Sequence, residues 1–144
     1  MANVHDVAAY IIDKCGDMTA MKLQKLAYYS QAWSLVWEDR GLFDAEIQAW
    51  ANGPIMPELY SIHRGQFSIT GWPKGSCDNI NSSDSETIDS VLEYYGDKSS
   101  QWLSDLTHHE QPWIDARKGL SPGERSDEVI CNSAMAEYYG ALAN

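Results

Sequence analysis

The stretch "MKLQKLAYYSQAWSLVW", residues 21–37, decides the fold that this 144-residue sequence predicts. Its apolar stripe recurs at three and four residues, the spacing of one face of an α-helix, and comprises Leu23, Leu26, Ala27, Ser30, Trp33 and Trp37. Thr19 stands where its hydroxyl can cap the first turn. We therefore predict a long core helix, with Lys22, Lys25 and Gln31 outside the apolar stripe.

Shorter helices are predicted on both sides of this element from residues that start or stop helices. Asn3 can cap a first helix from Val4 to about Cys15, which Gly16 ends. Further helices are expected to begin at Pro57, at the capping box of Ser83 and Glu86, after Ser99 or Ser100, at Pro112, and after Asn132 or Ser133. Turn residues dominate residues 66–83, which predicts a loop. The predicted fold is mainly α, a single compact domain of about seven short helices over residues 1–144.

The stretch "AEIQAWANGPIMPELY", residues 45–60, breaks an apolar run sharply. The Asn-Gly-Pro sequence at residues 52–54 is typical of a tight turn, and a minor β-strand pair is predicted near residues 46–56. Pro57 then suits the first position of a helix, because its missing N–H would have no helical partner there. We interpret the stretch as a rigid corner that turns the chain from the core helix to the next one.

Cysteine usage and the N-terminus limit where the protein works. Cys15, Cys77 and Cys131 are odd in number and form no CxxC pair, so neither a disulfide framework nor a zinc site is predicted. The apolar run "VAAYII" near the N-terminus is too short for a signal peptide or a membrane span. We expect a protein of the reducing cytoplasm that has no contact with a membrane.

Negative charge is concentrated in one segment. The net charge is −11, and residues 76–116 contribute −8 of it through nine acidic residues and one lysine. Binding to a phosphate backbone needs clustered Lys and Arg, so direct nucleic-acid binding is not expected. The charge serves solubility, meets a basic protein partner, or mimics nucleic acid.

The densest cluster of functional groups is Thr107-His108-His109-Glu110. Adjacent histidines cannot both face one metal ion from a regular helix, and no nucleophile or phosphate-binding turn accompanies them. A structural interpretation accounts for every residue: Thr107 caps, His108 bonds a neighbour, and Pro112-Trp113 starts the next helix with the indole packed inward. We predict no catalytic, metal-binding or cofactor-binding residues. The six Trp and eight Tyr are expected in the core and at interfaces.

Four blocks in this order and spacing carry a resemblance to a known family: "KLQKLAYYSQAW", "LFDAEIQAWANGPIMPELY", "LTHHEQPW" and "ICNSAMAEYY". Together they resemble the Panacea antitoxin domain, also described as SocA-like or GepA-type, which is frequent in bacterial, prophage and phage genomes. The resemblance runs from about residue 4 to residue 140. The chain departs from the family at Ala27, where a larger apolar residue is usual, and at Asn52, where an aromatic or basic residue is usual.

The resemblance implies a non-enzymatic helical protein that neutralises a toxin by binding it directly. It also implies a motif scaffold of Trp50, Gly53, Pro54, Pro57, Tyr60, Thr107, His108, Glu110, Pro112 and Trp113. We predict that the variable acidic segment binds the partner, through Asp84, Asp89, Glu93 and Asp97. The surface around Tyr60, Arg64 and Trp72 is the other predicted partner-binding surface. Two alternatives remain open: an inhibitor of a host defence complex encoded by a phage or prophage, and an adaptor that delivers a partner to a protease.

Overall fold

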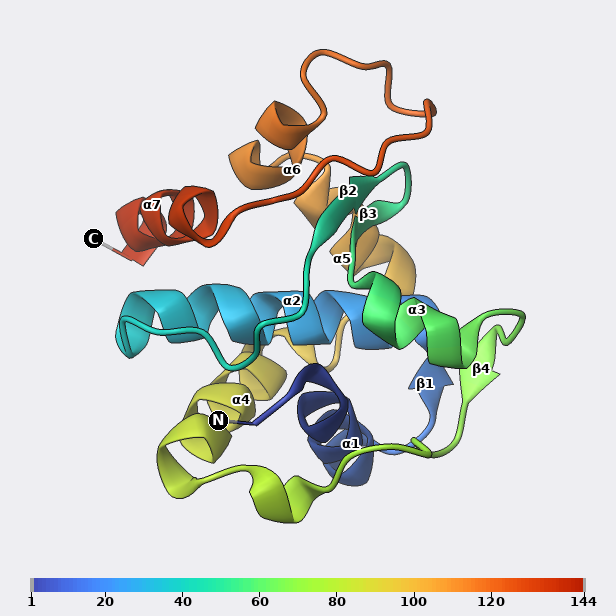
Figure 1. The fold of residues 1–144 in the computed structure, drawn as a ribbon, viewed down its shortest axis with the longest axis vertical. Helices are drawn as coiled ribbons and strands as arrows, with labels where there is room; N and C mark the ends of the chain where they lie inside the picture. Colours follow the sequence, from blue (N-terminus) through green and yellow to red (C-terminus); the bar gives the residue numbers. More distant parts are fainter. Residues whose placement is uncertain (1, 144) are drawn as a thin grey trace.

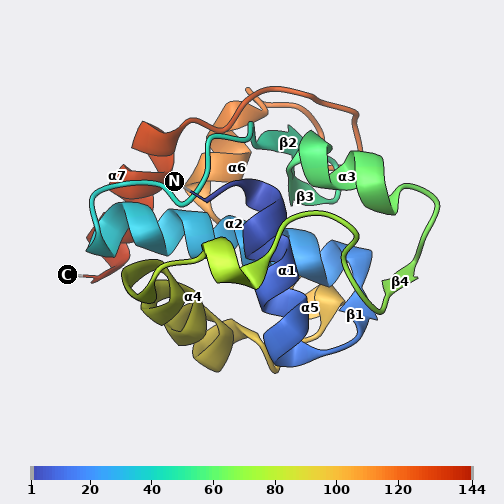
Figure 2. The ribbon, with the colours of Figure 1, turned by 60° about the horizontal axis from the view of Figure 1, so that its bottom comes forward.

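A computed structural model describes residues 2–143 and places one helix at the centre of the molecule. This helix, α2 (Ala20–Trp37), is the one that the apolar pattern predicts. Figure 1 shows α1 and α4 on one side of α2, and α6, α7 and a small β-hairpin on the other. Figure 2, turned by 60°, shows α1 crossing in front of α2, with the hairpin above α2 in that view. The core therefore forms around α2, with side chains from every layer packed against it.

Short helices dominate the described residues, as the sequence predicts. Besides α2 they are α1 (Val4–Cys15), α3 (Pro57–His63), α4 (Ser82–Tyr95), α5 (Ser100–Thr107), α6 (Gln111–Ala116) and α7 (Asn132–Ala143), with one 3-10 turn, η1 (Cys77–Asn79). The strands have two or three residues each: β1 (Met18–Thr19), β2 (Gln48–Trp50), β3 (Gly53–Ile55) and β4 (Ser68–Ile69). The prediction of a mainly α fold with about seven short helices is confirmed.

Side-chain caps fix the helix starts, mostly where the sequence places them. Asn3 caps α1 in a reciprocal capping box, and Thr19 caps α2 by accepting from the backbone N–H of Lys22. Ser99 caps α5 in the same way. The prediction for α4 is wrong by two residues, because Asn81 is its cap and Ser83 lies inside the helix. Asn, like Ser, satisfies a free N–H of the first turn, so the sequence offered two equivalent starts.

Helix α2 is buried on almost every side, which corrects the predicted polar face. Lys25 and Gln31 are buried, although the sequence pattern placed them outside the stripe. The Gln31 side chain accepts from the backbone N–H of Leu42 at 2.7 Å and donates to the carbonyl of Phe43 at 3.0 Å. Gln24 makes the same pair of bonds with the backbone of Met56, at 2.8 and 3.2 Å. These amides hold irregular backbone against the central helix, because buried backbone groups need partners.

The predicted strand pair exists at the corner after α2. Strands β2 and β3 pair antiparallel, with Gln48 opposite Ile55 and Trp50 opposite Gly53. A segment near the C-terminus joins this hairpin, since Ala49 N–H donates to Glu128 O and Ile130 N–H to Ile47 O, each at 2.8 Å. A second pair, β1 with β4, lies partly in the segment predicted as a loop. Its two-residue strands are too short for an alternating pattern to appear in the sequence.

Candidate partner-binding site

An open pocket of about 580 Å³ lies where α2, α4, α5 and α7 meet. Its lining consists of Trp33, Trp37, Ser90, Val91, Tyr94, Tyr95, Trp102, Leu106, Glu110 and Leu142. We call it the aromatic pocket. Four of the large apolar side chains that solvent reaches gather here: Trp37, Tyr94, Trp102 and Leu142, which are 42 to 64% exposed. Exposed apolar side chains that cluster in this way mark a binding surface rather than scattered surface residues.

The walls of the aromatic pocket are held rigidly by other aromatic side chains. Trp33 stacks on Trp37 with ring centroids 5.2 Å apart, and its indole N–H donates to the Tyr95 hydroxyl at 3.1 Å. Tyr95 in turn stacks on the buried Tyr29, with centroids 4.2 Å apart and planes 8° from parallel. A wall that is already ordered loses little side-chain entropy when a partner binds.

Glu110 brings a carboxylate to this apolar surface. The residue is only 5% exposed, yet it belongs to the pocket lining. Its Oε1 atom accepts from the hydroxyls of Tyr29 and Tyr139, each at 2.7 Å. Its Oε2 atom takes no hydrogen bond from the residues that the structure describes. Burial raises the pKa of the Glu110 carboxyl, and the two tyrosine hydrogen bonds oppose that shift.

A second polar cluster lies inside the protein, under the β2–β3 turn. The Lys25 amine is buried and has no hydrogen-bond partner among the described residues. Burial lowers its pKa to about 7. Burial also lowers the pKa values of His63 and His108, and the Lys25 charge adds to both shifts. The backbone closes over the amine: a Cβ atom on Gly53 would lie 2.7 Å from Lys25 Cε and 2.9 Å from Thr107 Oγ1.

The motif residues of the corner and of the "LTHHEQPW" block pack against each other. Trp50 and Tyr60 meet edge to face with centroids 5.0 Å apart, and Trp113 donates its indole N–H to the Trp50 carbonyl at 2.8 Å. His108 stacks on Trp113 at 4.3 Å. Thr107 does not cap the next helix, because its hydroxyl donates to the Ser104 carbonyl within α5. These contacts give Trp50, Tyr60, His108 and Trp113 packing roles.

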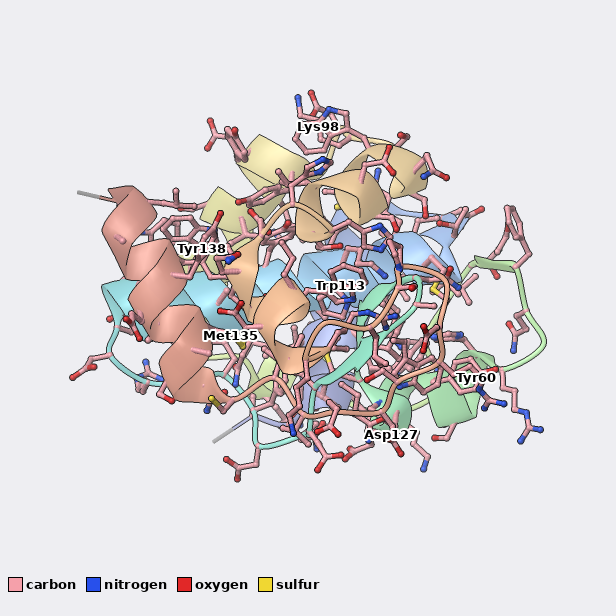
Figure 3. All side chains as sticks on the ribbon, turned by 90° about the horizontal axis from the view of Figure 1, so that it is seen from above. Tyr60, Lys98, Trp113, Asp127, Met135 and Tyr138 are labelled. Atoms are coloured by element: carbon pink, nitrogen blue, oxygen red, sulfur yellow. The ribbon has the colours of Figure 1, made fainter. Side chains whose placement is uncertain are left out.

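The predicted partner-binding residues do not form one surface. Asp84 is buried 2.9 Å from Arg40 Nη1, so its carboxylate already has an ion-pair partner within the protein and little of it reaches solvent. Asp89, Glu93 and Asp97 are exposed, and Asp89 also accepts from the Tyr10 hydroxyl at 2.7 Å. Tyr60, Arg64 and Trp72 belong to α3 and the chain after it. Figure 3 shows Lys98, next to Asp97 in sequence, and Tyr60 well apart, at different edges of the view.

Sequence reasoning missed the rim of the aromatic pocket. It assigned Trp37 to the core, but Trp37 is 49% exposed because α2 ends there and leaves its last turn partly uncovered. The signal that was available is the position of Tyr94 between Glu93 and Asp97, and of Trp102 between Asp97 and Asp105. Which of these rings face one another depends on how α4, α5 and α7 pack, and that information is not local.

Two further hollows of about 560 Å³ each lie elsewhere. One runs beside β2 and residues 125–127, and the other lies between α3 and the start of α5, next to the highly exposed Phe67. Neither gathers several exposed aromatic side chains. In the part of the chain that the structure describes, three or more His, Cys, Asp and Glu side chains do not meet at a possible metal site. None of the described helices is long and apolar enough to cross a membrane.

Comparison with known proteins identifies one family. The family model described as "Antitoxin SocA-like, Panacea domain" matches residues 23–114, well over half of the chain. The match runs from α2 to α6 and includes most of the aromatic pocket, with Glu110 near its end. Neither the curated proteins nor the solved structures include a match.

Proposed function

This chain belongs to the family of SocA-like antitoxins with a Panacea domain, and we propose that it neutralises a protein toxin by binding it directly. The family membership supports a role of the toxin–antitoxin type. Direct binding, and the surface that does it, are our proposal. The aromatic pocket is the observation that carries it, because it combines exposed Trp and Tyr side chains with a depth that a partner side chain can fill.

The composition of this surface suits a protein partner. Trp and Tyr are enriched among the residues that dominate binding energies, especially where they line preformed hollows. Trp37 and Trp102 stand on two different helices at the pocket, so one partner segment can contact both. We infer that these two side chains contribute most of the affinity.

Negative charge beside the pocket favours a basic partner. Glu86 and Glu93 are exposed on α4, the helix that also supplies Tyr94 to the pocket. Complementary charge speeds association and makes it sensitive to salt. This negative charge would attract a toxin whose active surface is basic, such as one that acts on nucleic acid, and binding would then cover that active surface.

We propose that the protein has no catalytic activity of its own. Two groups with perturbed pKa values are covered by their neighbours: the Lys25 amine is sealed beneath Gly53, and the His108 ring is stacked on Trp113. Glu110 is open to the pocket, but the lining holds no histidine, cysteine, lysine or second carboxylic acid that could act with it or activate the Ser90 hydroxyl.

The test is co-expression with the product of the neighbouring gene. We expect that product to arrest growth alone, to be harmless beside this protein, and to co-purify with it. A neighbour that is harmless alone, or one that is neutralised without any complex, would overturn the proposal. The level of the partner in cells separates two mechanisms: direct inhibition leaves the level unchanged, whereas an adaptor lowers it only while a protease is active.

A further inference from the structure

The aromatic pocket contains one carboxylate oxygen that the protein leaves without a partner. Glu110 Oε1 is fully used by the hydroxyls of Tyr29 and Tyr139, and both bonds fix the carboxylate in place. Oε2 belongs to a residue that lines the pocket and takes no hydrogen bond from the described residues. An apolar side chain in the pocket would strip water from this oxygen without replacing the hydrogen bond, which costs about 1 to 3 kcal/mol or more for a charged group.

The rings of the pocket suit a positive charge. Trp33, Trp37 and Tyr95 line it, and the π-faces of such rings attract cations. The rim already holds a cation of the same chain: Lys98 Nζ lies 5.2 Å from the centroid of the Trp102 ring. Lys98 also lies 3.5 Å from the Asp97 carboxylate and is not among the residues that line the pocket.

The negative charge of the neighbouring surface also favours a cation in the pocket. Glu86 and Glu93 are exposed on α4 with no ion pair to a described residue, unlike Asp84, which is paired with Arg40. The pocket therefore combines a carboxylate at its base, aromatic walls and acidic surroundings. Each of these favours a cation over a neutral or an anionic group.

We propose that the aromatic pocket takes an arginine side chain of the protein partner, whose guanidinium donates to Glu110 Oε2 and packs against the rings of Trp33, Trp37 and Tyr95. This inference rests on the proposed function and names the chemistry of the partner. Arginine fits better than lysine because its planar guanidinium stacks on aromatic rings and is more weakly hydrated than an ammonium group. The free oxygen of Glu110 accepts one N–H of the guanidinium, and the faces of the aromatic rings pack against the rest of the guanidinium plane.

The test uses blocked amino acids as probes of the full-length protein. Nα-acetyl-arginine N-methylamide is titrated while the indole N–H signals of Trp33, Trp37 and Trp102 are followed by NMR. The matching citrulline probe has the same shape without the charge, and the lysine probe has the charge without the planar group. Glu110→Gln keeps one oxygen that can accept from the two tyrosines and replaces Oε2, the proposed acceptor, with an uncharged NH2 group. Trp102→Ala is the second variant. Trp102 is 42% exposed in the wild-type protein, so removing its side chain leaves the core intact.

We expect saturable shifts of these indole signals with the arginine probe, and binding of the citrulline probe weaker by at least about tenfold, the loss expected for one charge-assisted hydrogen bond. Glu110→Gln and Trp102→Ala should weaken the arginine probe to a similar degree. Equal binding of arginine and citrulline, or unchanged arginine binding in both variants, would overturn the inference. Equal binding of the lysine probe would overturn the choice of arginine.

The outcome is separable from that of the proposed function. A toxin that binds wild-type protein and Glu110→Gln with equal affinity would refute the arginine anchor and leave toxin neutralisation standing. Conversely, specific binding of the arginine probe, together with a neighbouring gene product that is not toxic, would support the pocket chemistry and refute the toxin as its partner.

Discussion

At the scale of single residues, the buried amine of Lys25 has the clearest energetic consequence. Burial lowers its pKa from an ordinary value of 10.5 to about 7, so the unfolded chain binds this proton more tightly than the native protein does. Unfolding therefore takes up a proton between these two pH values, and the free energy of unfolding rises with pH there. The penalty is complete below about pH 7 and disappears above about pH 10.5.

We predict that Lys25→Met removes this pH dependence. The wild-type free energy of unfolding should rise by up to about 1.4 kcal/mol per pH unit between about pH 7 and 9.5, and the variant should lack that rise. The upper limit lies below the ordinary tyrosine pKa of 10.0, because above that pH the unfolded chain releases tyrosine protons that Tyr10 and Tyr95 retain in the native protein, where burial raises their pKa values to about 12. Denaturant unfolding at several pH values measures the slope. Lys74→Met, at an exposed lysine, is the control, and equal slopes in the two variants would refute the account.

A second residue-scale prediction separates two tryptophans that the sequence pattern treats alike. Trp113 is 5% exposed and Trp37 is 49% exposed. Trp113→Ala should therefore cost roughly 3 to 5 kcal/mol of stability, whereas Trp37→Ala should cost about 1 kcal/mol or less. Thermal or denaturant unfolding of the two variants measures both values. A loss for Trp37→Ala as large as that for Trp113→Ala would mean that the aromatic pocket is part of the core.

At the scale of elements, the β2–β3 turn depends on a glycine for two reasons. Gly53 has φ of 114°, and a Cβ atom there would overlap Lys25 and Thr107. We predict that Gly53→Ala destabilises the protein by roughly 2 to 5 kcal/mol, because backbone strain and overpacking add. Gly65→Ala is the matched control: its φ is 84°, but nothing lies within 4 Å of its Cβ position. If both variants lose a similar amount of stability, backbone strain alone explains the loss, and the close contact of Gly53 with Lys25 does not contribute.

Helix α4 offers a test of the acidic surface. Reversing Glu86, Glu93 and Asp97 to Lys should change stability by no more than about 0.5 kcal/mol per site, because all three side chains are exposed. Association with the toxin should become slower and less salt-dependent, which stopped-flow or surface-plasmon measurements can follow. Asp89 is left out because it accepts from the Tyr10 hydroxyl. The control reverses Asp13, Asp17 and Asp44 to Lys, which makes the same charge change on another part of the surface. An equal effect on association in the control would mean that net charge, rather than the position of the acidic residues, steers the toxin.

Elements could be predicted where their signals are local. The helix after Thr19 has a side-chain cap and apolar spacing, and the helix that begins at Pro57 has a proline at its first position, so both starts are predicted correctly. The burial of Lys25 and Gln31 could not be predicted, because residues remote in sequence cover them. The apolar stripe gave only one face of α2, while the protein packs other segments against nearly all of it.

At the scale of the whole molecule, the aromatic pocket is a product of tertiary packing. Trp37 and Leu142 lie more than a hundred residues apart in sequence, yet both line it. The resemblance to the Panacea family marked Glu110 as a motif residue. The family itself is confirmed by the match over residues 23–114. The position of Glu110 at an aromatic surface depends on Tyr29 and Tyr139, which come from α2 and α7. Composition and motifs therefore indicated a protein-binding role, but not the surface that serves it.

The affinity of the toxin for a double variant, Trp37→Ala with Trp102→Ala, tests the central claim most directly. Calorimetry should show a loss of at least about tenfold, because exposed tryptophans at the centre of an interface typically carry more than 1 kcal/mol each. Phe67→Ala is the matched control, since Phe67 is 82% exposed beside a different hollow. We expect Phe67→Ala to bind the toxin like the wild-type protein and the double variant to fail to protect cells. Wild-type affinity of a folded double variant, with a loss for Phe67→Ala, would contradict it and place the interface near α3.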